Sequence, residues 1–433
     1  MEFLDFLKKA KTAFHAVKEC EEILDSFGFD RISEGTKFNL ELGGKYYFTR
    51  NNSSLVAFIM PKSVKELRYN IVSAHTDSPT FKLKPNFKAT NRNYQLLNTE
   101  VYGGPIYSSW LDRPLDICGR VIIKTNKDTL QTRLISFDKP MAIIPNCSIH
   151  YNRELNNGYK YNPQIDLSPL CNDMSIENLD LVDLIAKKLD IKKESIVSYD
   201  LYLSSLDRGS IGGFNDEFIM APQIDNLECS YASLRALTMS EPIDDVCNMV
   251  VLFDNEEIGS GTRAGAASKL LSDILYRISN SLNLSLDDHM VALNNSVIIS
   301  ADNAQAYHPN YESKYDSTNV VYMYKGIVIK SAARGSYTTD ALGMALFTEI
   351  CKKANANYQI QTNRSDIPGG GTLGAISLSN VSILSIDIGL PQIAMHSSLE
   401  TAGKYDYDEL IKALKEFFNT KISIKEDGII KFD

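Results

Sequence analysis

The sequence lacks any run of about 18 apolar residues, the length that a membrane-spanning helix requires. Its most apolar stretch, residues 381–395, is interrupted by Asp387 and Pro391. The first residues, MEFLDFLKKAK, do not place a basic segment before an apolar one, so they do not read as a secretory signal. We therefore expect a cytoplasmic protein with no membrane partner.

Paired cysteines and basic clusters are also missing. The seven cysteines are an odd number and no CxxC pair occurs, which favours free, buried thiols in a reducing compartment. Lys plus Arg number 45 against 54 for Asp plus Glu, a net charge of −9. Because no long run of Lys and Arg is present, this balance argues against a nucleic-acid partner.

What remains is an ordinary globular composition of 433 residues, 44% hydrophobic and 23% charged, enough for two or three domains. Short apolar strands alternate with helical patterns, which predicts an α/β fold with a largely parallel sheet covered on both faces. The expected strands are 46–49, 54–60, 70–73, 248–253, 296–300 and 381–387, and the expected helices are 3–24, 228–239, 264–278, 339–353 and 407–418.

The middle of the chain is richer in alternating segments and turns. Residues 117–124 and 132–137, joined through Asn126-Lys127-Asp128, indicate a β-hairpin, and one helix is expected over 179–189. We predict that residues 1–87 and 214–433 form one domain and that residues 88–213 form a second, β-rich domain inserted into it.

Five segments place a metal-binding residue type directly after an apolar strand or at the start of a helix. These residues are His75, Asp225, Glu257, Asp302 and His396. In open α/β sheets, sites form at the carboxyl ends of the strands. We therefore expect the five side chains to gather in one polynuclear metal site.

The set of residue types indicates the metal. Two histidines and three carboxylates suit Zn²⁺, with Co²⁺ or Mn²⁺ as alternatives, and do not suit Ca²⁺ or a thiolate site. One bridging carboxylate, with two further ligands for each ion, holds two metals about 3.5–4 Å apart. We choose Asp225 as the bridge. Asp77 is expected to accept the second ring N–H of His75 and to fix its tautomer.

The adjacent residues Glu256 and Glu257 are expected to divide two tasks, because neighbouring residues in loop backbone point in different directions. With Glu257 as a ligand, Glu256 faces a water whose pKa zinc lowers towards about 7. Glu256 would then act as the general base and deliver the proton to a leaving amine.

Each of these features also has an ordinary structural explanation. A Glu-Glu pair is commonly a solvated surface feature, and an HxD motif is commonly structural. Asp225 could be a helix N-cap, Asp302 could cap a turn, and His396 could be a core histidine with satisfied hydrogen bonds. These explanations would have to hold at five positions at once, which favours a shared site.

At these positions the sequence resembles the M18 aminopeptidases, the family of aspartyl aminopeptidase and its bacterial relatives. The resemblance covers nearly the whole chain. The matching segments are SAHTDSP (73–79), WLDR (110–113), APQIDNL (221–227), DNEEIGS (254–260), SAD (300–302), HPNY (308–311) and PQIAMHS (391–397).

The resemblance implies a zinc-peptidase (phosphorylase/hydrolase-like) domain with an inserted dimerisation domain, and dimers assembled into a dodecamer with enclosed active sites. It implies two Zn²⁺ per subunit, held by the five residues above with Asp225 bridging, and Glu256 as the base in cleaving the N-terminal residue from peptides. The family's substrate-contacting lysine and tyrosine fall on Lys330 and Tyr337. Its histidine that reaches a neighbouring subunit's active site falls on His150, a candidate donor to the developing oxyanion.

Two positions depart from the aspartyl aminopeptidase pattern. Gln305 stands where those enzymes carry a histidine, and Ser365-Asp366 replaces an Asn-Asp pair. A neutral or broad N-terminal preference is thus an alternative to a strictly acidic one. Lys330 would read an acidic side chain or a terminal group.

Two further functions compete with an aminopeptidase. An amidohydrolase or deacylase would share the HxD and Glu-Glu chemistry, but we expect it to lack the inserted-domain histidine and the Lys330/Tyr337 pair. A catalytically idle scaffold or cargo protein would be expected to have lost a ligand or the base, and none of these residues is missing.

Overall fold

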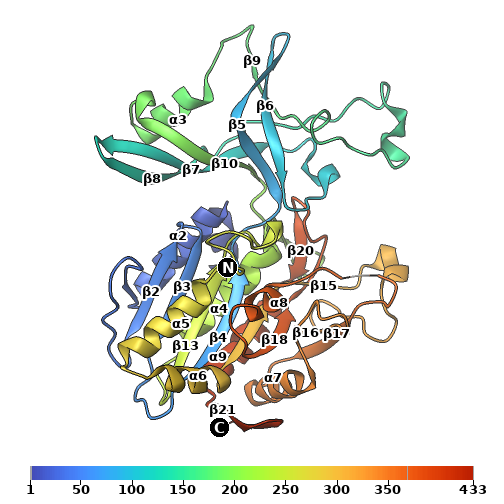
Figure 1. Ribbon diagram of the computed structural model, residues 1–433. Helices are drawn as coiled ribbons and strands as arrows, with labels where there is room; N and C mark the ends of the chain where they lie inside the picture. Colours follow the sequence, from blue (N-terminus) through green and yellow to red (C-terminus); the bar gives the residue numbers. More distant parts are fainter. Residues whose placement is uncertain (1, 368, 433) are drawn as a thin grey trace.

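The computed structural model describes residues 2–367 and 369–432, and a nine-stranded sheet forms its centre (Figure 1). In spatial order its strands are β1 (Asp30–Arg31), β2 (Lys45–Arg50), β3 (Ser54–Ile59), β13 (Val246–Phe253), β4 (Arg68–His75), β14 (Val297–Ala301), β18 (Leu384–Gly389), β16 (Ile327–Ser331) and β17 (Tyr358–Thr362). The four middle strands β13, β4, β14 and β18 are parallel, while β3 and β16 on either side run antiparallel to their inner neighbours. The predicted α/β fold is confirmed, with a mixed sheet.

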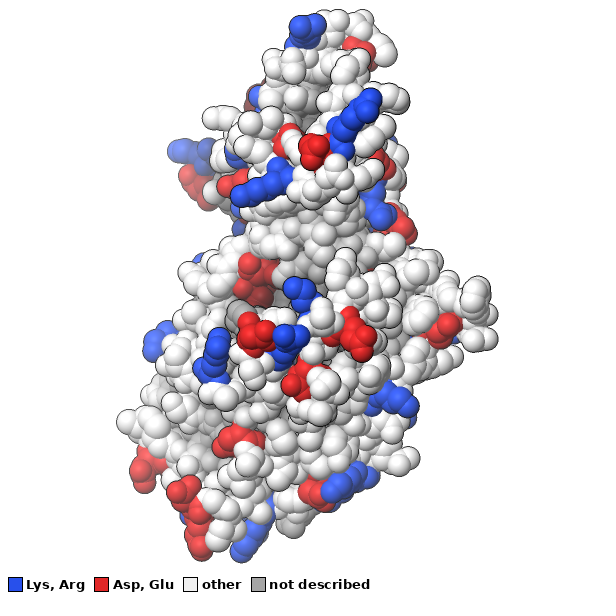
Figure 2. Space-filling model, turned by 90° about the vertical axis from the view of Figure 1, so that its right-hand side faces the viewer, with Lys and Arg blue, Asp and Glu red and all other residues white. Residues whose placement is uncertain are grey.

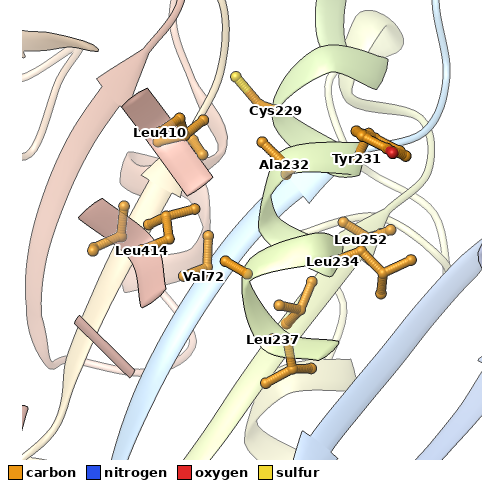
Figure 3. Packing of buried hydrophobic residues seen from close by; sticks show 14 of the residues in the cluster. Val72, Cys229, Tyr231, Ala232, Leu234, Leu237, Leu252, Leu410 and Leu414 are labelled. Atoms are coloured by element: carbon orange, nitrogen blue, oxygen red, sulfur yellow. The ribbon is translucent and has the colours of Figure 1, made fainter. Parts of the chain in front are cut away.

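Helices cover both faces of this sheet. The helices are α1 (Glu2–Lys9), α2 (Ala13–Ser26), α4 (Ile224–Thr238), α5 (Leu270–Ser281), α6 (Leu286–Asn294), α7 (Ala341–Ala354), α8 (Leu373–Leu378) and α9 (Asp406–Asn419). Adjacent residues of β4 point to opposite faces: Val72 packs in the core with α4 and α9, and Ile71 in the core with α5 and α8. Figure 3 shows the first of these cores, with Val72 lying between Leu414 of α9 and helix α4.

A separate antiparallel sheet lies above the first one in Figure 1. Its strands, in spatial order, are β8 (Thr129–Ser136), β7 (Leu115–Asn126), β10 (Ile196–Ser205), β5 (Thr80–Asn91), β6 (Tyr94–Tyr102) and β9 (Leu170–Asp173). Helix α3 (Leu181–Leu189) packs against it, and its core includes Trp110 and Ile117. The predicted hairpin of β7 and β8 and the predicted helix are confirmed. The strands of this sheet begin at Thr80 and end at Ser205.

Two smaller sheets complete the fold. One consists of β11 (Ser210–Gly212), β12 (Phe218–Ala221), β20 (Glu400–Gly403), β19 (Pro391–Ile393) and β15 (Ala304–Gln305), and the other of β21 (Ile422–Glu426) and β22 (Ile429–Phe432). On the face shown in Figure 2, acidic and basic side chains are interspersed on both lobes. Within residues 2–367 and 369–432, no helix has the length and apolar character needed to cross a membrane.

Two predicted helices have different limits in the structure. The helix expected over 3–24 is two helices, because Thr12 is in extended conformation and Lys11 is turned towards β7, where its Nζ lies 2.9 Å from Asp116 Oδ2. The helix expected over 264–278 begins only at Leu270. The preceding residues turn back on the loop after β13, where Ala267 N donates to Ser260 O (3.3 Å).

Candidate metal centre

Three neighbouring parallel strands deliver polar residues to one edge of the central sheet. His75 is the last residue of β4, Glu256 and Glu257 lie in a short turn directly after β13, and Asp302 directly follows β14. Since β13 and β14 both pair with β4 in parallel, their carboxyl ends meet at the same edge.

Two further residues come from separate loops. Asp225 lies at the start of α4, and His396 lies in the loop between β19 and β20. The turns that present these residues and the glutamates contain backbone in the left-handed region: φ is 63° at Gln223, 64° at Asn255 and 69° at His396. Non-glycine residues rarely adopt such angles, so the surrounding fold must hold these turns in place.

The five residues lie together and are divided by Asp225 into two halves. Oδ1 of Asp225 is 3.5 Å from His75 Nε2, which is itself 3.4 Å from Asp302 Oδ1. Oδ2 of Asp225 is 3.4 Å from His396 Nε2, which is 3.5 Å from Glu257 Oε2. Each half therefore has one histidine, one carboxylate that the other half does not share (Asp302 or Glu257) and one oxygen of Asp225.

These separations fit metal ions. A tetrahedral ion with bonds of about 2.0–2.1 Å has ligand atoms about 3.4 Å apart, and all four distances are close to that value, whereas they are long for hydrogen bonds. In addition, Asp225 Oδ1 and Glu257 Oε1 are buried carboxylate oxygens without a hydrogen-bond partner among the described residues. A buried, unpaired carboxylate is costly unless a cation compensates its charge. His75, Asp225 and Glu257 each offer a ligand atom, and these atoms lie within 4.8 Å of one another.

Electrostatics at the centre indicate the same need for positive charge. Burial would lower the pKa of His75, but the carboxylates of Asp225 and Asp302 raise that pKa well above its ordinary value. Burial, and then the charge of Asp225, raises the pKa of the Glu257 carboxyl well above its ordinary value. Burial also raises the pKa of Glu256, to about 7, with the nearby carboxylates adding to the effect. Without a cation, the protein can hold these groups together only by retaining protons.

Asp77 forms hydrogen bonds with several other residues of the site. His75 Nδ1 is 3.1 Å from the main-chain carbonyl of Asp77 and 3.5 Å from its carboxylate, so the closer acceptor is the carbonyl. The carboxylate instead accepts the main-chain N–H groups of Glu256 (3.1 Å to Oδ1) and Glu257 (3.2 Å to Oδ2). It also accepts from the Tyr102 hydroxyl at 2.8 Å. Asp77 thus fixes the turn that carries both glutamates.

Glu400 supports the centre and was not found from the sequence. It is buried, and its carboxylate accepts the main-chain N–H groups of Asp225 (3.0 Å) and His396 (2.6 Å). Burial, and then the charge of Asp225, raises the pKa of this carboxyl well above its ordinary value. The only signal in the sequence was its position four residues after His396. Glu400 therefore links the two loops that flank the sheet edge.

A cleft of about 410 Å³ opens beside Asp302, and Gln305, Lys330 and Tyr337 line it. Lys330 is buried beneath it: its Nζ donates to Asn303 O at 2.8 Å, lies 3.8 Å from Asp302 Oδ2 and stands over the ring of Tyr337. The glycine-containing segment 369–371 forms another part of the wall.

The structure does not bring His150 to this centre. His150 is exposed in the long loop between β8 and β9, where its Nδ1 is 3.2 Å from Ser148 Oγ. In Figure 1 this loop extends from the upper sheet, away from the edge at which β4 ends.

Comparisons with known proteins cover nearly the whole chain. Residues 6–418 match the family model for aminopeptidase I zinc metalloproteases (M18). Probable M18 family aminopeptidase 2 of Clostridium novyi (strain NT) is 45% identical over 424 residues, covering 96% of this chain and 98% of the relative. The protein of the same name from Clostridium acetobutylicum is 41% identical over 423 residues, covering 96% of this chain and 97% of the relative.

Two solved structures, one of them of an M18 family enzyme, have the same fold. The Thermotoga maritima aminopeptidase of the M18 family superposes with a TM-score of 0.85 at 27% identity, over 96% of this chain and 95% of that one. The mApe1 dodecamer of S. cerevisiae superposes with a TM-score of 0.84 at 29% identity, over 96% of this chain and 95% of that one.

Addition of Zn²⁺ to metal-free protein is expected to raise the thermal unfolding temperature, because a cation compensates the buried carboxylates only in the folded state. The measurement is the melting temperature against zinc concentration, reversed by a chelator. His75→Ala should remove most of the shift. His289→Ala is the matched control, since His289 is a buried histidine bonded to Ser279 and remote from the centre, and it should keep the shift. An equal zinc response of the His75 variant and the wild type would contradict the site.

Proposed function

The chain belongs to the M18 family of zinc aminopeptidases, and we propose that it uses two zinc ions to remove the N-terminal residue from peptides. The observation that carries this proposal is the division of five ligand residues by Asp225. One ion would be held by His75, Asp302 and one oxygen of Asp225, and the other by His396, Glu257 and the second oxygen. Co²⁺ and Mn²⁺ suit the same donors and are expected substitutes.

Glu256 is the general base in this proposal. Bound zinc supplies Lewis acidity, which polarises the scissile carbonyl and lowers the pKa of the attacking water. Glu256 takes a proton from that water and returns it to the leaving amine as the C–N bond breaks. Support comes from Asp77, whose carboxylate anchors the N–H groups of Glu256 and Glu257 and so keeps the two side chains directed to separate tasks.

The N-terminal side chain of the peptide would occupy the cleft beside Asp302, and we propose a broad preference for acidic and neutral residues. The buried ammonium of Lys330 gives the cleft a positive contribution, but it already bonds Asn303 O and lies close to Asp302. Gln305 and Gln361 contribute neutral amides to the wall. Such a wall disfavours a cationic side chain without requiring an anionic one. Tyr337, beside Lys330, would pack against the substrate.

We further propose that residues 88–213 form a dimerisation domain and that dimers build a dodecamer, the assembly named for the S. cerevisiae relative. His150 would act in the active site of a second copy and donate to the oxyanion that forms during water attack. Its exposure on a long loop supports this role, as does the exposure of its neighbours Ile149 and Tyr151, apolar side chains that a partner subunit would cover.

Glu256→Gln should lower kcat by about 10²–10⁴-fold, because the amide cannot take the proton from water. It should still bind two zinc ions per subunit, as measured by elemental analysis. Glu257→Gln is the matched neighbour and should instead lose zinc. Turnover of the Glu256 variant at the wild-type rate would contradict its role as base. Failure of the wild type to cleave any aminoacyl-p-nitroanilide with Zn²⁺, Co²⁺ or Mn²⁺ would contradict the enzyme.

A panel of Asp, Glu, Leu and Lys p-nitroanilides tests the cleft. We expect kcat/KM for Asp, Glu and Leu to agree within about tenfold and that for Lys to be more than about tenfold lower, since one unfavourable charge contact is worth at least 1.4 kcal/mol. Gln305→His restores the histidine of the aspartyl aminopeptidases and should raise the Asp-to-Leu ratio. A Leu value below about one hundredth of the Asp value would show a strictly acidic enzyme instead.

Subunit complementation tests the role of His150. His150→Ala should lower kcat by at least about tenfold, given the magnitudes measured for oxyanion donors. Co-expression of His150→Ala with Glu256→Gln should give mixed oligomers that are more active than either parent, because one intact site can be assembled from two subunits. The control is co-expression of Glu256→Gln with Glu257→Gln. This pair should not restore activity, because both residues belong to the same turn of the same subunit, so no site in the mixed oligomer has both glutamates intact. Mixed oligomers no more active than their parents would contradict action between subunits.

A further inference from the structure

The chain segment that leaves the upper sheet passes directly over the metal centre. We call residues Tyr102 to Ile106 the strap. It begins with the last residue of β6, and Thr80, the first residue of β5, pairs with Tyr102. Because β5 starts three residues after Asp77, the upper sheet is joined to the centre at two adjacent points. The strap is thus held by β5 and β6, the two strands that follow His75 and Asp77 in the chain.

The first contact of the strap is made by the Tyr102 side chain, which is buried. Its hydroxyl donates to Asp77 Oδ2 at 2.8 Å and accepts from Asn255 Nδ2 at 2.9 Å. Asn255 precedes Glu256 and has left-handed backbone. One hydroxyl therefore holds both the carboxylate that anchors the glutamate turn and the residue at which that turn begins.

The second contact orients His396. The Gly104 carbonyl accepts from His396 Nδ1 at 3.1 Å, and Ile106 N donates to the His396 carbonyl at 3.0 Å. A hydrogen bond from Nδ1 leaves the lone pair on Nε2, the atom that faces Asp225 and Glu257. The side chain of His396 is 32% exposed, so surrounding packing alone would not fix its ring.

The third contact explains why the strap contains glycine. At Gly103, φ is +69°, and a Cβ there would stand 3.1 Å from Glu257 Cβ. At Gly104, a Cβ would stand 3.5 Å from His396 Nδ1. A side chain at Gly103 would therefore have an unfavourable φ and would push Glu257 by a few tenths of an ångström, whereas a Cβ at Gly104 would make ordinary contact.

We propose that the strap is a positioning element of the metal centre, in which Tyr102 sets the glutamate turn through Asp77 and Gly104 sets the ring of His396. This proposal rests on the two-zinc aminopeptidase function above. In this arrangement the upper sheet is part of the catalytic apparatus, because the strap that continues β6 holds the turn of Glu256 and Glu257 and also holds His396. A shift of the sheet relative to the central domain would be transmitted to the base and to the two ligands Glu257 and His396.

Tyr102→Phe is the direct test, with Tyr202→Phe as its matched control. The two rings pack edge to face, with centroids 5.7 Å apart, and the control removes a hydroxyl from the neighbouring ring while leaving the bond to Asp77 intact. We expect Tyr102→Phe to lower kcat by about 10–100-fold with KM changed less than about twofold, and to alter the visible absorption spectrum of the Co²⁺-loaded protein. Tyr202→Phe should match the wild type in both measurements. A Tyr102 variant with wild-type kcat and an unchanged Co²⁺ spectrum would overturn the proposal.

Gly103→Ala provides a second variant that does not depend on the hydroxyl. Its new methyl group should displace Glu257 and weaken zinc binding by about tenfold, measured by competition with a chromogenic chelator. Gly28→Ala is the control, because Gly28 has a similar φ of +74° but open space where the Cβ would stand. Equal zinc affinity of the two variants would overturn the proposal.

The tests separate the strap from the function on which it rests. If the wild type cleaves peptides and Tyr102→Phe equals it in kcat and spectrum, the strap proposal fails and the aminopeptidase function stands. If the wild type cleaves no substrate but the Co²⁺ spectrum and zinc affinity respond to the strap variants, the function fails and the positioning role stands.

Discussion

The constraint on which the structure depends is the repulsion among carboxylates gathered in a buried space. Asp77, Asp225, Glu257 and Asp302 have largely buried side chains within one small region, and Glu400 is buried directly behind them. Isolated buried charges are costly, and like charges in contact raise that cost further. Two histidines alone cannot balance the set, so without cations some of these carboxyl groups keep their protons, and bound cations would stabilise the folded state. In the proposed function, the same residues therefore contribute both to the chemistry and to stability.

The fold meets this constraint with parallel strands and main-chain donors. The ends of β4, β13 and β14 bring ligands from distant parts of the chain to one edge, while the loops carrying Asp225 and His396 close the centre from the other side. Main-chain N–H groups neutralise part of the charge: Asp77 accepts two of them and Glu400 accepts two others. These donors are fixed by secondary structure and turns, so they hold the carboxylates in place before any ion is bound.

Local sequence patterns predicted the α/β fold, the β-hairpin of the upper sheet and the strand ends that carry His75, Glu257 and Asp302, because each depends on a short apolar run followed by polar residues. The break between α1 and α2 was missed, since Lys11 leaves the helical path for Asp116, a contact across more than 100 residues. Glu400 and Tyr102 were missed for the same reason. Each acts through residues far away in the sequence, and a single buried glutamate or tyrosine carries no pattern of its own.

Lys330 illustrates how burial changes the meaning of a residue type. A lysine beside a substrate cleft suggests a free cation that would select acidic side chains. Here the ammonium donates a hydrogen bond to the carbonyl of Asn303 and lies near Asp302. Part of its positive charge therefore already compensates the negative charge of that carboxylate in the metal centre. Burial would lower the pKa of Lys330, but the acidic groups around it, Asp302 foremost and Asp387 among the others, together outweigh that effect and keep the lysine protonated. In the proposed function, selectivity for the N-terminal residue then depends on the rest of the cleft wall, which includes Gln305 and the charged side chains of Lys314, Asp316 and Arg364. Lys330 therefore couples the charge of the cleft to that of the metal centre, because it lines the one and lies 3.8 Å from a carboxylate of the other.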